Sequence, residues 1–297
     1  MGKLKQKSAP YCLFILVFYL AEAIFLPYVV MYLTETGMTT AQASLAYSGM
    51  NIGAIIGGLG LGYCADRTRN PRGTLACAVG LSAGLILLLR LGTGVAFGAA
   101  VLFLFGFLEQ PDIDLFDNLL VQNVKNWEKA FSVVHSFGNL GYVLGLLIAG
   151  GMLTAYGYGW LFAAAAVMLV ISGISCAGMG SGCGRQEKKN KVPLRALFRN
   201  HMSVAIYLVS FLWGVIETGT LAFATKYYTD LGYTASYAAM MISIAIAGQV
   251  LSYTWLYRNQ EKVSQPMLCF GGFALLALRI ISMALVGIFP PAVLVVM

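Results

Sequence analysis

The chain has 297 residues, of which 59% are apolar and only 10% are charged, and its mean hydropathy is +0.78. An ordinary soluble domain carries about 25% charged residues, so this composition excludes one. The formal net charge is +7. Because the basic residues gather in particular loops between apolar segments, membrane topology explains this charge better than nucleic-acid binding does.

Apolar segments of about twenty residues follow one another along the chain, and each is long enough to cross a hydrocarbon core of ~30 Å. We expect them to be helices, because an open sheet would leave backbone groups unpaired in lipid. The sequence therefore predicts an all-α membrane protein. The expected spans are 11–33, 42–65, 73–92, 95–123, 131–154, 158–179, 203–229, 233–257 and 266–288, with a tenth that begins near Pro290.

The first span is expected to remain in the protein as a helix. Its apolar stretch is too long for a signal peptide, and no small-residue cleavage site follows it. The cysteines lie in or near spans without metal-ligand or redox spacing, so we expect small apolar side chains there and no metal or cofactor site. They are Cys12, Cys64, Cys77, Cys176, Cys183 and Cys269.

The loops between the spans predict the orientation of the chain, since Lys and Arg in short loops tend to stay cytoplasmic. If every span crosses, the exceptions among the 19 basic residues are Arg90 and Lys226 on the opposite side and Arg279 within a span. We therefore expect a multi-pass protein of the cytoplasmic (inner) membrane with a cytoplasmic N-terminus. The residues on that side are Lys3, Lys5, Lys7, Arg67, Arg69, Arg72, Lys125, Lys129, Arg185, Lys188, Lys189, Lys191, Arg195, Arg199, Arg258 and Lys262.

A repeated unit divides the chain into two halves. When the sequence is shifted by 195 residues against itself without a gap, Glu22 falls on Glu217, and matches continue as far as Pro71 on Pro266. A repeat made of several apolar spans has the period of half a membrane transporter. The expected domains are a six-helix bundle at 1–179, a cytoplasmic linker at 180–200 and a partial bundle of about three and a half helices at 201–297.

Chemistry is expected at ionisable groups inside the spans, because each is costly in lipid unless it faces a cavity or a partner. Glu22 and Glu217 lie near the centres of their spans, and a pseudo-twofold axis along the membrane normal would make them face each other at one depth. We expect both to bind substrate and to carry a coupling proton, although a neutral glutamic acid could equally be a plain hydrogen-bond donor. The other such groups are Glu109, Asp112, Asp114, Asp117, His135 and Arg279.

The fourth span carries four of these acids close together. At about 100° per residue they fan over an arc of about 200°, which is too wide for one cavity wall, so at least one must point elsewhere. Asp117 lies toward the cytoplasmic end, and His135 enters the fifth span from that side. The two should sit at a similar depth and could form a charge-assisted pair. The alternative is a histidine bonded to a backbone carbonyl.

Tyr142 lies two turns above His135 on the same face of the fifth span, with Gly138 and Gly145 beside it. Small residues let another helix or a ligand approach closely. An aromatic ring over a glycine-bare face suits a planar or ring-shaped solute, yet close helix packing explains the glycines equally well. Both interpretations stay open at this point.

These motifs resemble the major facilitator superfamily, and within it the lactose-permease-like and nucleoside/proton symporter-like group. Residues 62–67 (GYCADR) resemble the G-x-x-x-D-R loop between the second and third helices, with Arg69 at a position that is usually glycine. In the family, the acid and base of this loop pair with neighbouring helix ends and latch the cytoplasmic face. The resemblance therefore implies a gating role for Asp66 and Arg67.

A second motif of the resemblance joins the fourth and fifth helices. The lactose-permease pattern is a helix-four carboxylate followed by Arg-x-x-Gly-x-x-Gly-Trp on helix five, and Asp117 with residues 135–142 (HSFGNLGY) looks like it. The resemblance implies that Asp117 and His135 bind substrate hydroxyls and that Tyr142 stacks on the substrate ring. His and Tyr replace the family's Arg and Trp, which argues against galactoside specificity.

The resemblance extends into the second half, which is expected to be incomplete. Residues 278–281 (LRII) resemble the helix-nine segment of the family, which implies a role in proton coupling for Arg279. Under the same 195-residue shift, Met297 corresponds to Leu102, so counterparts of the fourth to sixth spans are absent. An intact relative is expected to have about twelve helices. We therefore expect a six-helix N-terminal bundle with an incomplete C-terminal bundle, truncated after the start of helix ten, which puts transport by the chain as it stands in question.

We expect a secondary active transporter that moves a small polar solute, a sugar or nucleoside, by alternating access in symport with protons, and no enzyme activity. Its expected partners are the solute, protons and the lipid bilayer, with no nucleic acid and no cofactor, and we expect a monomer. An organic-acid carrier or an exporter of drugs or metabolites is the alternative, although acidic residues in the spans argue against anions. A non-transporting membrane sensor, assembly partner or fragment is a further possibility.

Overall fold

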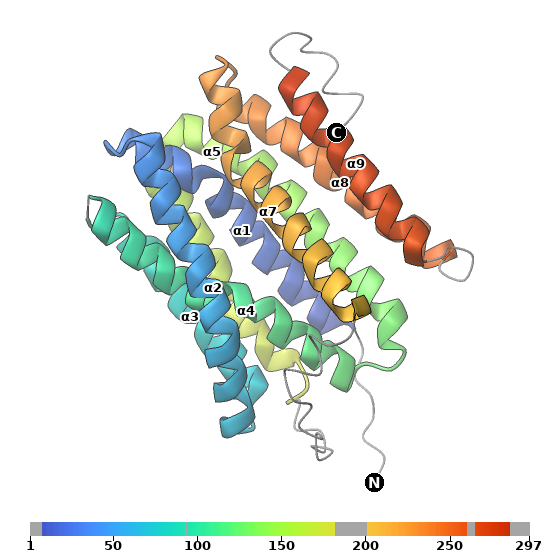
Figure 1. Ribbon diagram of the computed structural model, residues 1–297. Coiled ribbons are helices and arrows are strands. Elements are labelled where there is room, and N and C mark those ends of the chain that lie inside the picture. The colour runs from blue at the N-terminus through green and yellow to red at the C-terminus, as the bar shows by residue number, and fades with distance from the viewer. Residues whose placement is uncertain (1–7, 93, 182–200, 260–264, 286–297) are drawn as a thin grey trace.

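The computed structural model describes residues 8–92, 94–181, 201–259 and 265–285 (Figure 1). Within these ranges every regular element is a helix, so the predicted all-α fold is confirmed. The tenth span near Pro290 and nearly all of the predicted linker lie outside the described residues. The elements are α1 (Ala9–Glu35), α2 (Thr40–Thr68), α3 (Pro71–Leu88), α4 (Val95–Asn123), α5 (Trp127–Ser175), the 3-10 helix η1 (Cys176–Gly178), α7 (His201–Asp230), α8 (Ala235–Asn259) and α9 (Gln265–Leu285).

The α5 helix contains both the fifth and the sixth predicted spans. Its 49 residues are interrupted at Gly157, whose φ of 72° and ψ of −179° are not helical. Beyond this kink the chain runs back along α1. The Tyr158 hydroxyl donates to the Glu35 carboxylate at 3.0 Å, at the end of α1. The Ser172 hydroxyl donates to the Phe14 carbonyl near the start of α1.

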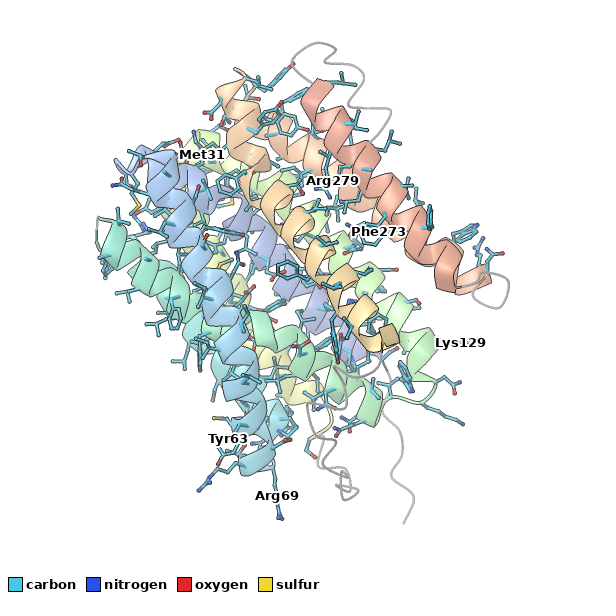
Figure 2. All side chains as sticks on the ribbon, in the orientation of Figure 1. Met31, Tyr63, Arg69, Lys129, Phe273 and Arg279 are labelled. Carbon is cyan, nitrogen blue, oxygen red and sulfur yellow. The ribbon has the colours of Figure 1, made fainter. Side chains whose placement is uncertain are left out.

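The chain is a multi-pass membrane protein. Among the described residues, six helices are long and apolar enough to cross a membrane, with the second part of α5 counted together with the first. Arg72 donates to the Met179 carbonyl at 3.0 Å, so the α2–α3 turn lies beside the end of α5. Arg90 donates to a carbonyl just past the α5 kink, at the opposite end. Figure 2 shows Arg69 at the first end and Met31 at the other, which agrees with the alternation predicted from the basic residues.

Close approach of helix backbones holds the first half together. On α2, Gly53 and Gly57 face the backbone of α4, and a Cβ at Gly57 would strike the Phe107 carbonyl. On α5, a Cβ at Gly141 would strike the Leu16 carbonyl of α1 in the same way. In lipid no hydrophobic effect drives helices together, and close van der Waals packing holds them instead. Small residues such as these glycines permit that packing.

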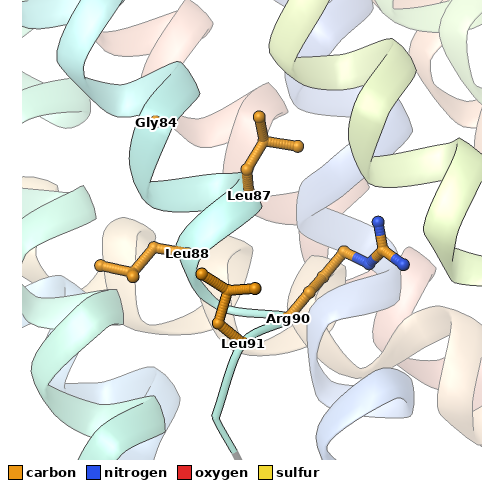
Figure 3. A pocket seen from close by; sticks show the side chains of 5 residues that line it. All are labelled: Gly84, Leu87, Leu88, Arg90 and Leu91. Atoms are coloured by element: carbon orange, nitrogen blue, oxygen red, sulfur yellow. The ribbon is translucent and has the colours of Figure 1, made fainter.

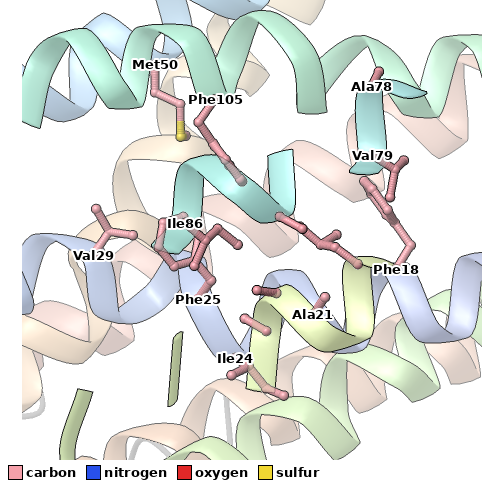
Figure 4. Close-up of a cluster of buried hydrophobic side chains, with 14 of the residues drawn as sticks. Phe18, Ala21, Ile24, Phe25, Val29, Met50, Ala78, Val79, Ile86 and Phe105 are labelled. Carbon is pink, nitrogen blue, oxygen red and sulfur yellow. The ribbon is translucent and has the colours of Figure 1, made fainter. Parts of the chain in front are cut away.

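Helix α1 lies at the centre of the first half and is largely buried, as expected of a helix that is apolar around most of its circumference. Phe25 of α1 packs on Phe105 of α4 with ring centroids 5.1 Å apart, and Phe14 stacks on Phe116 at 5.0 Å. Figure 4 shows Phe18 and Phe25 among the side chains of this core. The two ring contacts fix an antiparallel register between α1 and α4.

The second half contacts the first through α7 and α8. Gly150 of α5 lies against Ser236 of α8, and Tyr142 of α5 belongs to one buried cluster with Tyr228 of α7 and Ile242 of α8. Figure 1 shows α2–α4 on one side of α1 and α5, and α7–α9 on the other. The boundary between the two halves therefore runs along α1 and the first part of α5.

The glycine contacts between α2 and α4 predict opposite outcomes for adjacent substitutions. Gly57→Ala should destabilise the protein by about 1–3 kcal/mol, because the added methyl group must displace the α4 backbone. Gly58→Ala is the control, since a Cβ there would meet nothing within 4 Å, and it should be neutral or slightly stabilising. Unfolding of the purified variants in detergent measures both. Equal stability of the two variants would contradict the packing described.

Candidate functional site

A cluster of carboxyl groups lies at mid-depth between α1 and α4. The antiparallel register set by Phe14–Phe116 and Phe25–Phe105 places the middle of α1 opposite the middle of α4. As a result, the side chains of Glu22 and Glu109 are joined by a hydrogen bond, and the charges acting on Glu22 come from Glu109 and Asp112. We call these three residues the carboxyl cluster.

The carboxyl cluster can exist only if it holds a proton. Glu109 and Asp112 have no exposed surface, whereas Glu22 is partly exposed. An ionised carboxylate only accepts hydrogen bonds, so the bond between Glu22 and Glu109 requires that one of them be protonated. Both carboxyl oxygens of Asp112 are buried with no hydrogen-bond partner among the described residues. Three adjacent acids between helices of a membrane protein therefore make a site for at least one exchangeable proton.

The carboxyl cluster lies beside the boundary between the two halves. Tyr47 of α2 is buried and close enough to Glu22 and Glu109 for their charges to act on its phenol. The Tyr47 ring also contacts Phe223 of α7, with centroids 6.4 Å apart. A movement of α7 relative to α2 would therefore change the surroundings of the carboxyl cluster.

The acids of α4 point in different directions, as their spacing predicts. Glu109 and Asp112 face the interior, whereas Asp114 is exposed and Asp117 is partly exposed. Asp114 is therefore the acid that points away from the others. In the described part of the chain, no group of three or more His, Cys, Asp or Glu side chains is placed to hold a metal ion.

The predicted contact between Asp117 and His135 is present. The His135 Nε2 atom lies 3.0 Å from the Asp117 Oδ1 atom. Because the carboxylate accepts only, Nε2 must carry the proton, in the neutral ring or in the imidazolium. The Phe131 ring covers the imidazole with centroids 4.1 Å apart. The histidine is thus bonded to a side chain and not to a backbone carbonyl, while its role in substrate binding stays a prediction.

Tyr142 lies at the boundary between the halves and not over an open glycine face. Its ring meets Tyr19 of α1 edge-on, with centroids 6.4 Å apart and an angle of 89°. The face beside it is filled, because Cβ atoms at Gly138 and Gly145 would strike Tyr19 and the backbone of Leu20. Helix packing is therefore the observed role of these glycines. That Tyr142 stacks on a substrate ring stays a prediction.

The second-half residues of the predicted site are less fully described. Glu217 belongs to α7, but its side chain lies outside the described residues. Arg279 of α9 lies near Tyr228 of α7, close enough for its charge to act on the phenol, and Figure 2 shows it in the second half. Whether Glu22 and Glu217 face each other, and whether Arg279 serves proton coupling, stay predictions.

The predicted gating residues lie at the exposed end of α2. Arg67 donates from Nη1 to the Tyr63 hydroxyl at 3.0 Å, one turn earlier on its own helix. Asp66 is exposed and forms no ion pair within the part of the chain that is described. Arg69 ends α2 in the left-handed conformation, with φ of 52°. This conformation explains why the resembling motif has glycine there.

Glu22 lies within the first helix, as the sequence predicts, but the sequence does not predict its partner. The sequence indicates Glu109 and Asp112 as ionisable groups within a span but gives no role to them or to Tyr47. The signal that could have paired Glu22 with Glu109 is the register of aromatic residues on α1 and α4. Aromatic residues are frequent in both helices, so this register can be recognised only from the ring contacts in the structure.

In a comparison with protein families, the model described as Major Facilitator Superfamily matches residues 11–297. Comparison with curated proteins gives no match.

Comparison with solved structures gives transporters with a shared fold. A crystal structure of an aspartate-to-alanine mutant of the nucleoside transporter NupG has a TM-score of 0.71 at 15% identity, covering 84% of this chain and 68% of that one. The unmutated NupG has a TM-score of 0.66 at 16% identity, with the same coverage. A crystal structure of a D-xylose-proton symporter has a TM-score of 0.62 at 15% identity, covering 97% of this chain and 78% of that one.

The conformation of Arg69 predicts a gain in stability on substitution by glycine. A residue with a Cβ in the left-handed region costs about 1 kcal/mol relative to glycine. We expect the free energy of unfolding of Arg69→Gly to be about 1 kcal/mol higher than that of Arg69→Ala. The alanine variant also lacks the guanidinium but keeps the Cβ, so the comparison isolates the backbone strain. Denaturant unfolding of the two variants tests this. An alanine variant as stable as the glycine variant would argue against the strain.

The contact between Asp117 and His135 predicts an energetic coupling between the two side chains. In a double-mutant cycle with Asp117→Asn and His135→Gln, the coupling energy should be about 1 kcal/mol in favour of the native pair. The free energies of unfolding of the four proteins measure it. Additivity of the two single substitutions to within about 0.3 kcal/mol would show that the pair contributes nothing to stability.

Proposed function

The chain belongs to the major facilitator superfamily, and from this premise we propose that it is a proton-coupled symporter of a small polar solute, a sugar or a nucleoside. Its helices have the fold of that superfamily, and it is a membrane transporter and not an enzyme. The similar structures are a nucleoside transporter and a D-xylose-proton symporter. Nucleosides and D-xylose both contain a hydroxylated ring, so this is the first solute class to examine for this chain.

The carboxyl cluster is the observation that carries the proton coupling. The hydrogen bond between Glu22 and Glu109 needs a proton, and the partial exposure of Glu22 gives that proton a way in and out. The contact of Tyr47 with Phe223 links the surroundings of the cluster to the second half. Alternating access would hydrate the cluster in one state and bury it in the other, so proton release would depend on the position of the two halves.

Asp117 and His135 are proposed to bind solute hydroxyls, with Tyr142 and Glu217 completing the site across the boundary between the halves. A charge-assisted pair offers both donors and acceptors to a hydroxyl group. Asp117 lies five residues beyond Asp112 on α4, about 7.5 Å along the axis. One helix therefore carries a proton-binding acid and a solute-binding acid, which would allow occupancy of one to influence the other.

The remaining parts of the proposal concern coupling, gating and orientation. Arg279 is proposed to assist Glu22 and Glu217 in proton coupling, and Asp66 with Arg67 to latch the cytoplasmic face. The protein would act as a monomer in the cytoplasmic membrane with its N-terminus inside. Since the charged groups acting on Glu22 are other acids, an anionic solute is disfavoured.

Removal of the Glu22 carboxyl tests the coupling directly. In proteoliposomes containing the full-length protein, Glu22→Gln should abolish accumulation of solute driven by a pH gradient. Exchange of labelled for unlabelled solute, which needs no net proton movement, should continue. Asp114→Asn is the matched control, because Asp114 is exposed, and it should leave both activities unchanged. Unaltered proton-driven accumulation by Glu22→Gln would refute the proposed role.

A ligand-binding measurement tests the solute site separately. A panel of sugars and nucleosides is first screened for thermal stabilisation of the purified protein. His135→Ala should then lose the stabilisation given by any solute identified, because the hydroxyl-binding pair is broken. Phe131→Leu, which removes the ring over His135 but keeps an apolar side chain, should reduce the thermal stabilisation by the solute less than His135→Ala does. Affinity retained by His135→Ala would move the solute site elsewhere.

A further inference from the structure

A groove lies on the outer surface of α3, at the end of the bundle where Arg90 meets α5 (Figure 3). Its volume is about 390 Å³, within the range of small-molecule sites, about 300–1,000 Å³. Of the residues that line the groove, Gly84, Leu87 and Leu88 lie on one face of α3, and Arg90 and Leu91 follow just after its end, whereas the opposite face of α3 packs into the protein core.

The floor and walls of the groove suit a hydrocarbon chain. Leu87 on the last turn of α3 is 43% exposed, and Leu91, just past the end of this candidate membrane span, is 82% exposed, so both side chains project from the surface. One turn before Leu87 the surface is open, because Gly84 has no side chain and a Cβ there would meet nothing within 4 Å. An exposed apolar hollow on the outside of a membrane helix faces lipid chains, which are the apolar molecules present at high concentration there.

Arg90 adds a positive charge to one end of the groove. The side chain is exposed, and its Nη1 donates a long hydrogen bond of 3.4 Å to the Gly159 carbonyl. Among the described residues Arg90 has no ion pair, whereas Lys226, predicted on the same side of the membrane, is held by Asp230 at 2.9 Å. Arg90 therefore keeps guanidinium donors for an anionic group at the membrane interface.

We propose that the α3 groove binds an anionic phospholipid. One acyl chain lies over Gly84 and along the leucines, and the phosphate of the headgroup accepts hydrogen bonds from Arg90. The pairing of an apolar groove with a cation at its interfacial end matches the two parts of such a lipid. A second copy of the chain fits less well, because a stable protein interface buries about 1,200–2,000 Å² with a well-packed centre, far more than five residues provide.

Lipid retention by the purified full-length protein tests this site. Native mass spectrometry is carried out after addition of phosphatidylglycerol or phosphatidylcholine with identical acyl chains. The protein should retain more phosphatidylglycerol than phosphatidylcholine. Arg90→Gln should weaken its binding about five-fold, the effect expected of one basic side chain at an anionic membrane surface, and should leave phosphatidylcholine unchanged. Gly84→Leu should weaken both lipids, because the new side chain fills the hollow.

Two controls separate the groove from general surface effects. Gly80→Leu lies one turn away on α3, outside the groove and also in open space, and it should bind lipid as the unmodified protein does. Thermal unfolding without added lipid should be the same for Arg90→Gln and the unmodified protein, which excludes misfolding through the lost contact with Gly159.

Three outcomes would overturn the proposal. Equal retention of the two lipids by the unmodified protein would show that the headgroup is not recognised. Displacement of the lipid by glycerol phosphate at the concentration of the lipid would identify a site for free anions. A change in oligomeric state caused by Gly84→Leu would make a second copy of the chain the occupant of the groove.

Discussion

The hydrogen bond between the carboxyl groups of Glu22 and Glu109 is the interaction on which the account of this transporter depends. Two ionised carboxylates repel each other and can only accept hydrogen bonds, so the bond persists only while one carboxyl holds a proton. The structure maintains this arrangement inside the bundle, where Glu109 is fully buried and Glu22 is partly exposed. Proton occupancy is therefore built into the stability of the first half.

The packing of the first half explains why these acids meet. Gly57 and Gly141 allow α2 and α5 to approach α4 and α1 closely, and the ring contacts of Phe14 and Phe25 align α1 with α4. Neither feature leaves the helices free to slide. The carboxyl cluster consequently has a defined depth beside Tyr47. The Tyr47 ring in turn contacts Phe223 of the second half. A movement of the second half relative to the first can thus change the surroundings of the shared proton, even if the helices of the first half keep their positions.

Much of the fold could be predicted because it depends on local composition. Apolar length predicts the spans, and the contact between Asp117 and His135 followed from counting residues on consecutive spans that enter from one side. The partner of Glu22 could not be predicted in this way, since α1 and α4 are distant in sequence and their register depends on which rings meet. The glycines beside Tyr142 were ambiguous for the same reason: only the position of α1 shows that a helix, and not an open face, lies against them.

Infrared spectroscopy of the protein in lipid at neutral pH tests the central claim most directly, because the carbonyl stretch of a protonated carboxyl group is distinct from that of a carboxylate. The account predicts a protonated carboxyl band that decreases in Glu109→Gln and in Glu22→Gln and is unchanged in Asp114→Asn. Absence of that band in the unmodified protein, or a band indifferent to both glutamine substitutions, would contradict a shared proton between α1 and α4.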